Sequence, residues 1–330
     1  MNTTDPMNTT PARQGPFDTG ASKSARGGAG HTDFVEFHRF LDCVHCGLCI
    51  PSCPTFLELG TEMDSPRGRI QLMRSIHEGR LGLDDKSVLH LDGCLGCRAC
   101  ETACPSGVRY GELIEGARGL IQAHYPRSLR ERVKRWAINR VFPSPWAMRQ
   151  FSRLTSIMMF LRLHHLRRSS WLPSGLRQIL RYLPDSRSVF SKVRIPPDVP
   201  ANGTRRFRVG LLSGCIMPNL FGATHANTVK LLSQNGCDIH LPAEAGCCGA
   251  LLLHNGEKQR GLTLARSVIK AFQARDLDAI LTNAAGCGAA MKEYGEHFKD
   301  DPELRDAALS VSAKVKDITE FLAEVPGIDP

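Results

Sequence analysis

Residues 43–54 read Cys-Val-His-Cys-Gly-Leu-Cys-Ile-Pro-Ser-Cys-Pro, and residues 94–105 repeat the spacing as Cys-Leu-Gly-Cys-Arg-Ala-Cys-Glu-Thr-Ala-Cys-Pro. Each stretch is a C-x2-C-x2-C-x3-C-P run, which is a ligand pattern of [4Fe–4S] clusters. Three cysteines three residues apart let one tight loop reach three corners of a cubane cluster. The proline ends the run and turns the fourth cysteine away from the other three. The two runs therefore predict a helical, cluster-binding domain.

The two runs also predict that the clusters exchange a ligand. In a pair of such runs the fourth cysteine ligates the other cluster, as in bacterial two-cluster ferredoxins. The predicted ligands are Cys43, Cys46, Cys49 and Cys104 for the first cluster and Cys94, Cys97, Cys100 and Cys53 for the second. Zinc sites pair a C-x2-C with a distant pair of ligands and do not need a third evenly spaced cysteine. Zinc and inert buried thiols therefore explain the runs less well than clusters do.

The composition favours metal-bound thiolates over disulfides. The chain has 330 residues and 13 Cys, so it is long enough for about two domains. Disulfide frameworks belong to short secreted chains that start with a signal peptide. The first thirty residues have no apolar core of that kind, and no run of about 18 apolar residues occurs. We expect a cytoplasmic protein, either dissolved or peripheral on the inner face of the membrane.

Shifts in composition divide the chain into four segments. Residues 1–30 predict a disordered tail. Residues 31–125 hold both cysteine runs and predict the helical domain, with apolar periodicity typical of helices over residues 66–79 and 111–124. The other two segments are a basic helical connector, residues 126–200, and an α/β domain, residues 201–330, in which strands and helices alternate. The expected fold class is α plus α/β.

Four cysteines in the last segment follow strands that we expect over residues 207–213, 237–241 and 278–282. They are Cys215, Cys247, Cys248 and Cys287, and glycines flank them. Ligand sites in parallel α/β sheets lie beyond the carboxyl ends of the strands, so these thiols should converge. A metal ion or cluster fits such a set better than separate structural or redox thiols do. Cys237 begins a strand at its opposite end and is expected in the core.

Together these features resemble the iron–sulfur subunit of bacterial glycolate oxidase. The resemblance rests on the two runs and on the stretches Asp64-Ser-Pro-Arg-Gly-Arg69, Cys104-Pro-Ser-Gly-Val-Arg-Tyr110 and Glu244-Ala-Gly-Cys-Cys-Gly249. It covers about residues 31–325 and includes the CCG cysteine-rich domain that heterodisulfide reductase also has.

The CCG part departs from the family pattern. Members usually carry two CCG repeats, whereas this sequence shows one, and that repeat ends in Ala284-Ala-Gly-Cys287 in place of C-x-x-C. For the four converging thiols the alternatives are therefore a further iron–sulfur cluster, a zinc ion and an incomplete site.

The resemblance implies an electron-transfer subunit of an oxidoreductase that is not catalytic alone. The sequence has no G-x-G-x-x-G fingerprint, P-loop or G-x-S-x-G elbow, and iron–sulfur clusters move single electrons. FAD on partner subunits must therefore accept the hydride. In the resembled enzyme, flavoprotein subunits oxidise glycolate to glyoxylate and the electrons leave toward quinone. The alternatives are a subunit of another flavin-linked dehydrogenase, for glycerol 3-phosphate or lactate, and a non-catalytic electron carrier.

Two groups of basic residues each have more than one interpretation. Residues 126–194 contain sixteen Lys or Arg against two acids, with Trp and Phe between them. They fit a solvated connector, a surface on anionic lipid or a docking face for a flavoprotein, and no nucleic-acid-binding motif accompanies them. Arg67 and Arg69 either offset the negative charge of a cluster or are ordinary surface arginines at the start of a helix.

Overall fold

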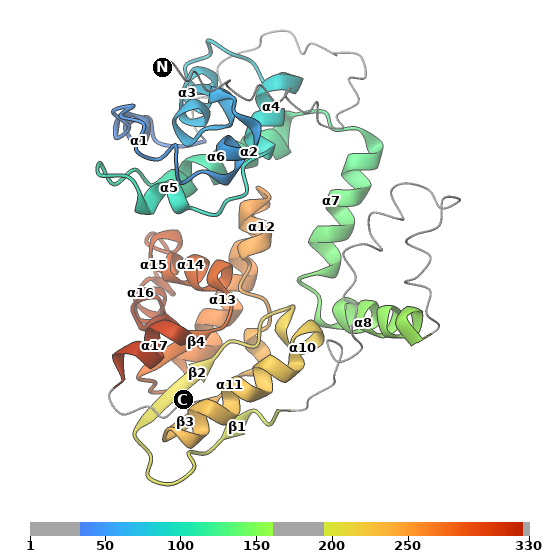
Figure 1. Ribbon diagram of the computed structural model, residues 1–330, viewed down its shortest axis with the longest axis vertical. Coiled ribbons are helices and arrows are strands. Elements are labelled where there is room, and N and C mark those ends of the chain that lie inside the picture. The colour runs from blue at the N-terminus through green and yellow to red at the C-terminus, as the bar shows by residue number, and fades with distance from the viewer. Residues whose placement is uncertain (1–33, 161–194, 326–330) are drawn as a thin grey trace, which may run out of the picture.

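The polypeptide forms a helical part and an α/β part, which are connected by α7 (Leu129–Val141) and α8 (Pro145–Phe160), as Figure 1 shows. The computed structural model describes residues 34–160 and 195–325. The predicted tail and residues 161–194 of the predicted connector lie outside these ranges. The architecture confirms the expected fold class, α plus α/β.

Short helices surround the cysteine runs in the helical part. They are α1 (His38–Leu41), α2 (Pro54–Leu59), the 3-10 turn η1 (Glu62–Asp64), α3 (Pro66–His77), α4 (Asp85–Asp92), α5 (Ala99–Thr102) and α6 (Tyr110–His124). The helices predicted over residues 66–79 and 111–124 are α3 and α6. α3 begins where the Ser65 hydroxyl accepts a hydrogen bond from the Gly68 amide at 3.0 Å, and Pro66 takes the first helical position.

One apolar core holds these helices together. α3, α4 and α6 fill it with side chains that are shielded from solvent, among them Met73, Leu91, Leu113 and Ile121. Each such side chain contributes about 1.5–3 kcal/mol by leaving water. Five cysteines of the runs belong to this cluster or pack against it, namely Cys43, Cys49, Cys94, Cys100 and Cys104. The core therefore fixes the positions of the cysteine loops.

The α/β part is built on a five-stranded sheet in the order β1-β3-β2-β4-β5. Its strands are β1 (Asp198–Val199), β2 (Phe207–Leu211), β3 (Cys237–His240), β4 (Ala279–Thr282) and β5 (Val315–Asp317). β2, β3 and β4 coincide with the strands that the sequence predicts. The pairs β2–β3, β2–β4 and β4–β5 are parallel, and only β1 runs antiparallel, beside β3.

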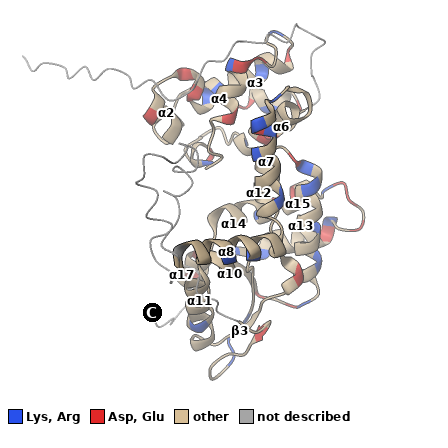
Figure 2. Ribbon diagram, turned by 90° about the vertical axis from the view of Figure 1, so that its right-hand side faces the viewer, with Lys and Arg blue, Asp and Glu red and all other residues tan. Residues whose placement is uncertain are grey.

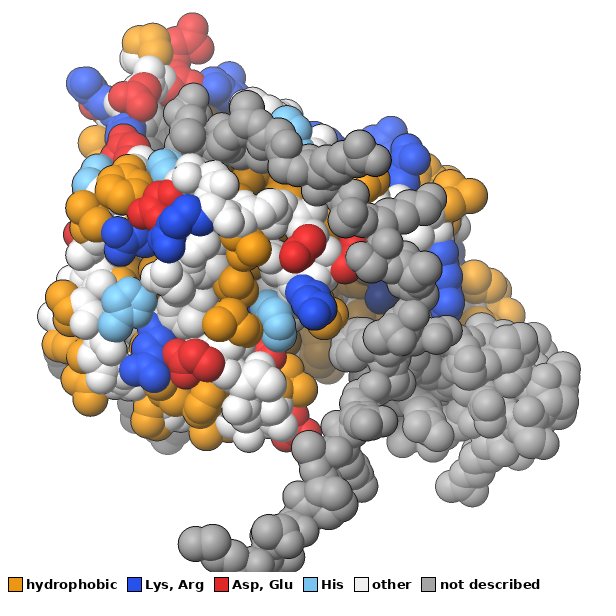
Figure 3. Space-filling model, turned by 90° about the horizontal axis from the view of Figure 1, so that it is seen from above, with side chains coloured by type: hydrophobic (Ala, Val, Ile, Leu, Met, Phe, Trp, Pro, Cys, Tyr) orange, Lys and Arg blue, Asp and Glu red, His pale blue; other side chains and the backbone are white. Residues whose placement is uncertain are grey.

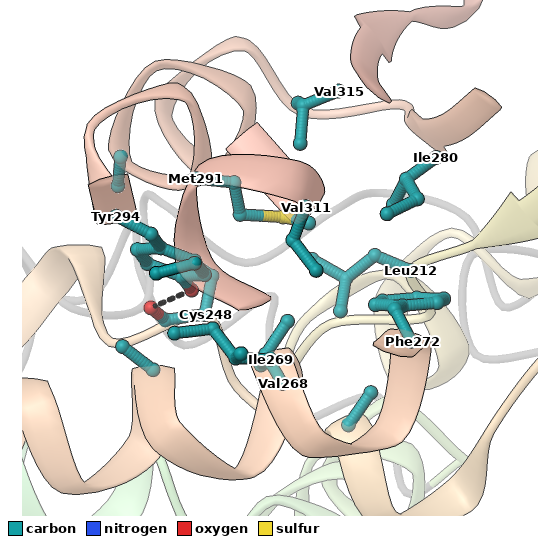
Figure 4. Packing of buried hydrophobic residues seen from close by; sticks show 14 of the residues in the cluster. Leu212, Cys248, Val268, Ile269, Phe272, Ile280, Met291, Tyr294, Val311 and Val315 are labelled. Atoms are coloured by element: carbon teal, nitrogen blue, oxygen red, sulfur yellow. Dashed lines mark hydrogen bonds between the residues drawn. The ribbon is translucent and has the colours of Figure 1, made fainter. Parts of the chain in front are cut away.

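Helices cover both faces of the sheet, as is usual for parallel strands. The helical segments of this part are α10 (Met217–Leu220), α11 (Gly222–Gln234), η4 (Ala243–Ala245), α12 (Ala250–His254), α13 (Lys258–Gln273), α14 (Ala285–Lys292), α15 (Tyr294–His297), α16 (Arg305–Lys314) and α17 (Ile318–Glu324). On one face Ile280 packs with Phe272, Met291 and Val311 (Figure 4). On the other face its neighbour Leu281 packs with residues of α11 and α17. This alternation buries β4 on both sides.

Two glycines allow α12 to cross α13 closely. Gly249 precedes α12 with φ +84°, a left-handed conformation that favours glycine. A Cβ at Gly249 would lie 2.5 Å from the carbonyl oxygen of Gly261, which is on α13. Gly249 also ends the Glu244–Gly249 stretch, so this contact fixes the loop that carries Cys247 and Cys248.

We expect Gly249→Ala to lower the free energy of unfolding by about 2–3 kcal/mol, because the new Cβ meets backbone and the residue must keep a left-handed φ. The measurement is the midpoint of urea unfolding followed by circular dichroism. Gly286→Ala is the matched control. Gly286 lies in α14 with no heavy atom within 4 Å of its ideal Cβ, so alanine should be neutral there or stabilise by up to about 1 kcal/mol. Equal midpoints for the two variants would contradict the expectation.

Candidate iron–sulfur and thiol centres

The first predicted ligand set surrounds one small cavity in the helical part. Three of its members come from the first run and one from the second, and the set is Cys43, Cys46, Cys49 and Cys104. The loop of the first run turns tightly because His45 has φ 55° and Gly47 has φ 85°. Cys46, between them, is exposed to solvent.

The second predicted set surrounds a second cavity in the same way. It consists of Cys94, Cys97 and Cys100 from the second run and Cys53 from the first. Left-handed residues occupy the same two places in this run, Gly96 with φ 65° and Arg98 with φ 57°. Cys97, the counterpart of Cys46, is likewise exposed. The two runs thus have one backbone design, and each contributes its fourth cysteine to the cavity of the other.

The thiols in these cavities are crowded and partly buried. Burial raises the pKa of Cys43 and Cys49, and it raises the pKa of Cys100 to about 12 with a further contribution from Cys94. All thirteen cysteines are free thiols. Four thiols around one cavity match the donor set of a [4Fe–4S] cluster, whose binding would release the thiol protons. The hydroxyl of buried Tyr110 donates to the Cys94 sulfur at 3.6 Å.

One of the two predicted arginines lines each cavity, and their surroundings differ. Arg67 lies at the first cavity, is partly exposed, and donates to the His45 carbonyl at 3.3 Å and to Glu62 at 2.7 Å. Arg69 lines the second cavity with a side chain that is only 1% exposed. Its guanidinium bonds Thr55 at 2.8 Å and Asp64 at 3.1 Å. Arg69 is therefore not a surface arginine.

The buried carboxylate that pairs with Arg69 remains ionised. Burial alone would raise the pKa of Asp64, but hydrogen bonds from Thr61 and His90 and the charge of Arg69 outweigh burial and lower it. One guanidinium nitrogen of Arg69 also lies 4.0 Å from the Cys53 sulfur. The positive charge of Arg69 therefore lies beside Cys53, the cysteine of the first run that lines the second cavity.

Two further arginines tie the second cavity to the α/β part. Arg98, between Cys97 and Cys100, forms ion pairs with Glu115 of α6 at 3.0 Å and with Glu293, which follows α14. Arg118 of α6 donates to the Cys94 carbonyl and, at 3.0 Å, to the carbonyl of His254 at the end of α12. The sequence motifs indicated neither arginine as part of the site. The only available signal was that Arg98 lies inside a cysteine run.

The four cysteines of the α/β part lie together, as the strand ends predict. Cys215 follows β2, Cys247 and Cys248 precede α12, and Cys287 lies in the first turn of α14. The sulfurs of Cys248 and Cys287 are 3.2 Å apart, and hydrogen bonds join Cys247 to Cys215 and to Cys248. These contacts lower the pKa of Cys247 and raise those of Cys215 and Cys248.

The spacing of these thiols bears on the zinc alternative. Zinc–sulfur bonds of about 2.3 Å place the sulfurs of a tetrahedral site about 3.8 Å apart, which is more than the separation between Cys248 and Cys287. Within residues 34–160 and 195–325, no three His, Cys, Asp or Glu side chains are arranged as around a single metal ion.

The loop that carries Cys247 and Cys248 is held by Tyr294, whose hydroxyl donates a hydrogen bond to the Cys248 carbonyl at 2.7 Å (Figure 4). Cys237 is fully buried in β3, in the core as expected.

Comparison with known proteins identifies both parts of the chain. Residues 39–108 match the 4Fe-4S dicluster domain family, and residues 209–292 match the cysteine-rich domain family known as CCG. No solved structure matches.

Individual proteins from two bacteria match most of the chain. The "Probable glycolate oxidase iron-sulfur subunit" of Bacillus subtilis (strain 168) is 43% identical over 291 residues, which are 86% of this chain and 66% of that protein. The "Glycolate oxidase iron-sulfur subunit" of Escherichia coli (strain K12) is 39% identical over 287 residues, 86% of this chain and 65% of that protein. The chain thus spans about two thirds of the length of these relatives. The resemblance inferred from the cysteine motifs is confirmed.

A third relative matches less of the chain. "Lactate utilization protein A" of Exiguobacterium sp. (strain ATCC BAA-1283 / AT1b) is 31% identical over 117 residues, 36% of this chain and 48% of that protein. The glycolate oxidase subunits are therefore similar over a much longer stretch.

Substituting Cys53 is expected to damage a different cluster from substituting Cys49, although both residues belong to the first run. We expect wild-type protein purified without oxygen to hold about eight iron and eight sulfide per chain in the helical part. Electron paramagnetic resonance of the reduced protein should show the second cluster altered in Cys53→Ser and the first in Cys49→Ser. Cys237→Ala, in the sheet core, should leave both signals unchanged. The crossed assignment is wrong if Cys53→Ser and Cys49→Ser alter the same signal identically.

The Arg98–Glu293 pair is expected to stabilise the contact between the two parts. In a double-mutant cycle with Arg98→Gln and Glu293→Gln, the coupling in the free energy of unfolding should be about 1–3 kcal/mol, because both side chains are largely buried. The more exposed pair Arg109–Glu296, 3.7 Å apart, crosses the same boundary and is the control. Its coupling should stay below about 1 kcal/mol. Equal couplings in the two cycles would count against a special role for Arg98.

Proposed function

We propose that this chain, a homologue of glycolate oxidase iron–sulfur subunits over most of its length, relays electrons in a flavin-linked glycolate dehydrogenase. The observation that carries the proposal is the crosswise lining of two cavities by eight cysteines. We assign a [4Fe–4S] cluster to each cavity, with Cys43, Cys46, Cys49 and Cys104 on the first and Cys53, Cys94, Cys97 and Cys100 on the second. When bound, the clusters would accept and pass on electrons one at a time.

The chain's own residues would hold the clusters and set their electrostatic surroundings. A cluster on four thiolates carries a net negative charge, which nearby cations offset and which hydrogen bonds to the sulfurs reduce. Arg67 would offset the negative charge of the first cluster. Arg69 would offset the charge of the second, and the Tyr110 hydroxyl would donate a hydrogen bond to one of its sulfur ligands. Arg69 acts from a buried position, where charges interact more strongly than at the surface.

The hydride acceptor is assigned to partner subunits. Oxidation of glycolate to glyoxylate releases two electrons, which FAD can accept together and pass on singly to clusters. The sequence has no nucleotide-binding fingerprint, and cysteines follow its strands β2, β3 and β4 where such a fingerprint would lie. We therefore propose FAD-binding glycolate oxidase subunits as partners and a membrane quinone as the destination of the electrons. The exposed apolar side chains Val44 and Leu48 in the first run would suit a docking partner there.

The four thiols of the α/β part are proposed to hold a third centre, an iron–sulfur cluster, because the separation of the Cys248 and Cys287 sulfurs does not suit a zinc ion. Their convergence at the strand ends supports the proposal, and the hydrogen bonds of Arg98 and Arg118 place this part against the second cavity. The shorter and weaker match to lactate utilization protein A favours glycolate over lactate as the substrate of the partner subunits.

The isolated chain is expected to show no glycolate-dependent reduction of an artificial dye, because it has nothing that accepts a hydride. Mixed with its flavoprotein partners, it should allow glycolate to reduce a water-soluble quinone analogue. Cys100→Ser should reduce that coupled rate to background while the dye reduction by the flavoproteins alone persists. Glycolate oxidation by the isolated chain, or full coupled activity of Cys100→Ser, would refute the relay function.

A further inference from the structure

Helix α8 directs apolar side chains toward solvent. Trp146, Leu154 and Ile157 fall on one side of the helix and are each more than half exposed. The opposite side faces the protein with Met148, Ser152 and Thr155, all buried. A helix that only covers a core has the reverse arrangement, with polar residues outward. In Figure 2 this helix lies across the front of the molecule, at its surface.

The exposed side of α8 is also positively charged. Arg149 and Arg153 are exposed beside the apolar residues, and α8 contains no acidic residue. α7 repeats the pattern, with Leu129, Val133 and Trp136 exposed at helical spacing. The sole acid of α7, Glu131, is engaged by Arg127 and Arg135.

The charge on α7 and α8 differs from that of the helical part. On the face of the molecule seen from above, acidic and basic side chains lie next to one another (Figure 3). Residues 129–160 instead hold seven Lys or Arg against one acid. Residues 161–194 continue with eight against one, so they have the same sign of charge and would not neutralise Arg149 and Arg153.

We propose that the exposed side of α8, together with that of α7, binds the surface of an anionic lipid bilayer. Arginines flanking Trp and aliphatic side chains are the pattern of helices that lie in a membrane interface, and anionic headgroups supply the charge that is lacking here. None of the described helices has the length and apolarity that crossing a bilayer requires, so α8 would lie in the plane of the interface. The inference deepens the proposed function, since a quinone acceptor resides in a bilayer.

The test is flotation of the whole, cluster-loaded chain with lipid vesicles, without substrate or partner. Binding is expected to vesicles of phosphatidylcholine with about a third phosphatidylglycerol, to weaken with added salt, and to be absent with phosphatidylcholine alone. Arg149→Gln with Arg153→Gln should weaken binding about 30-fold. Trp146→Ser with Ile157→Ser should weaken it at least about tenfold through lost apolar contact.

The control variants make the same kinds of substitution at exposed residues outside α7 and α8. Lys230→Gln with Lys270→Gln removes two exposed charges from α11 and α13, and Leu309→Ser removes an exposed leucine from α16. These variants should bind vesicles as wild type does. All variants should keep their iron and sulfide content and their coupled reduction of a water-soluble quinone analogue, which separates this proposal from the relay function.

Three outcomes would overturn the lipid proposal. The wild-type chain could fail to bind anionic vesicles, or the control variants could lose as much binding as the α8 variants. Binding that arises only after residues 161–194 are deleted would mean that the chain covers α8 itself. Crosslinks from α8 to a flavoprotein subunit, with no vesicle binding by the assembled complex, would identify a protein docking face instead.

Discussion

The exchange of one cysteine between the two runs is the constraint on which the helical part depends. Each cavity needs three side chains from one tight loop and a fourth from a loop about fifty residues away in sequence. Both loops must therefore be held by the same core, and α3 and α6 provide it between them. The first run cannot shift without moving Cys53 in the second cavity. In the same way, the second run cannot shift without moving Cys104 in the first cavity.

The sequence predicts those features that depend on local spacing. The composition of the two cavities follows from the cysteine spacing, and the meeting of Cys215, Cys247, Cys248 and Cys287 follows from the rule that parallel strands end at one edge. Helices α3 and α6 have enough turns for an apolar period to be visible. Strands β1 and β5, with two and three residues, are too short for any alternation to identify them.

Contacts between residues far apart in sequence could not be predicted. Arg67 and Arg69 appear equivalent in the sequence. Because they are two positions apart on helix α3, they point to opposite sides of it, Arg67 toward solvent and Arg69 into the interior. Arg98 and Glu293 are 195 residues apart, and their pairing depends on how the α/β part packs on α6. A sequence pattern indicates which face of a helix or strand is apolar. It does not indicate which polar residue of another domain will contact that helix or strand.

The crossed cavities have a consequence for how the protein matures on the ribosome. Under the proposed ligand sets, a nascent chain that ends before Cys94 carries Cys43, Cys46 and Cys49 of the first set, Cys53 alone of the second, and no complete donor set. The second set is complete once Cys100 has been added, and the first set only once Cys104 has been added. Neither cluster can therefore obtain four cysteine ligands until the second run has been translated, and a chain with a frameshift between the runs would hold no complete donor set. The contact of Arg98 with Glu293 forms later still, because Glu293 is translated 195 residues after Arg98.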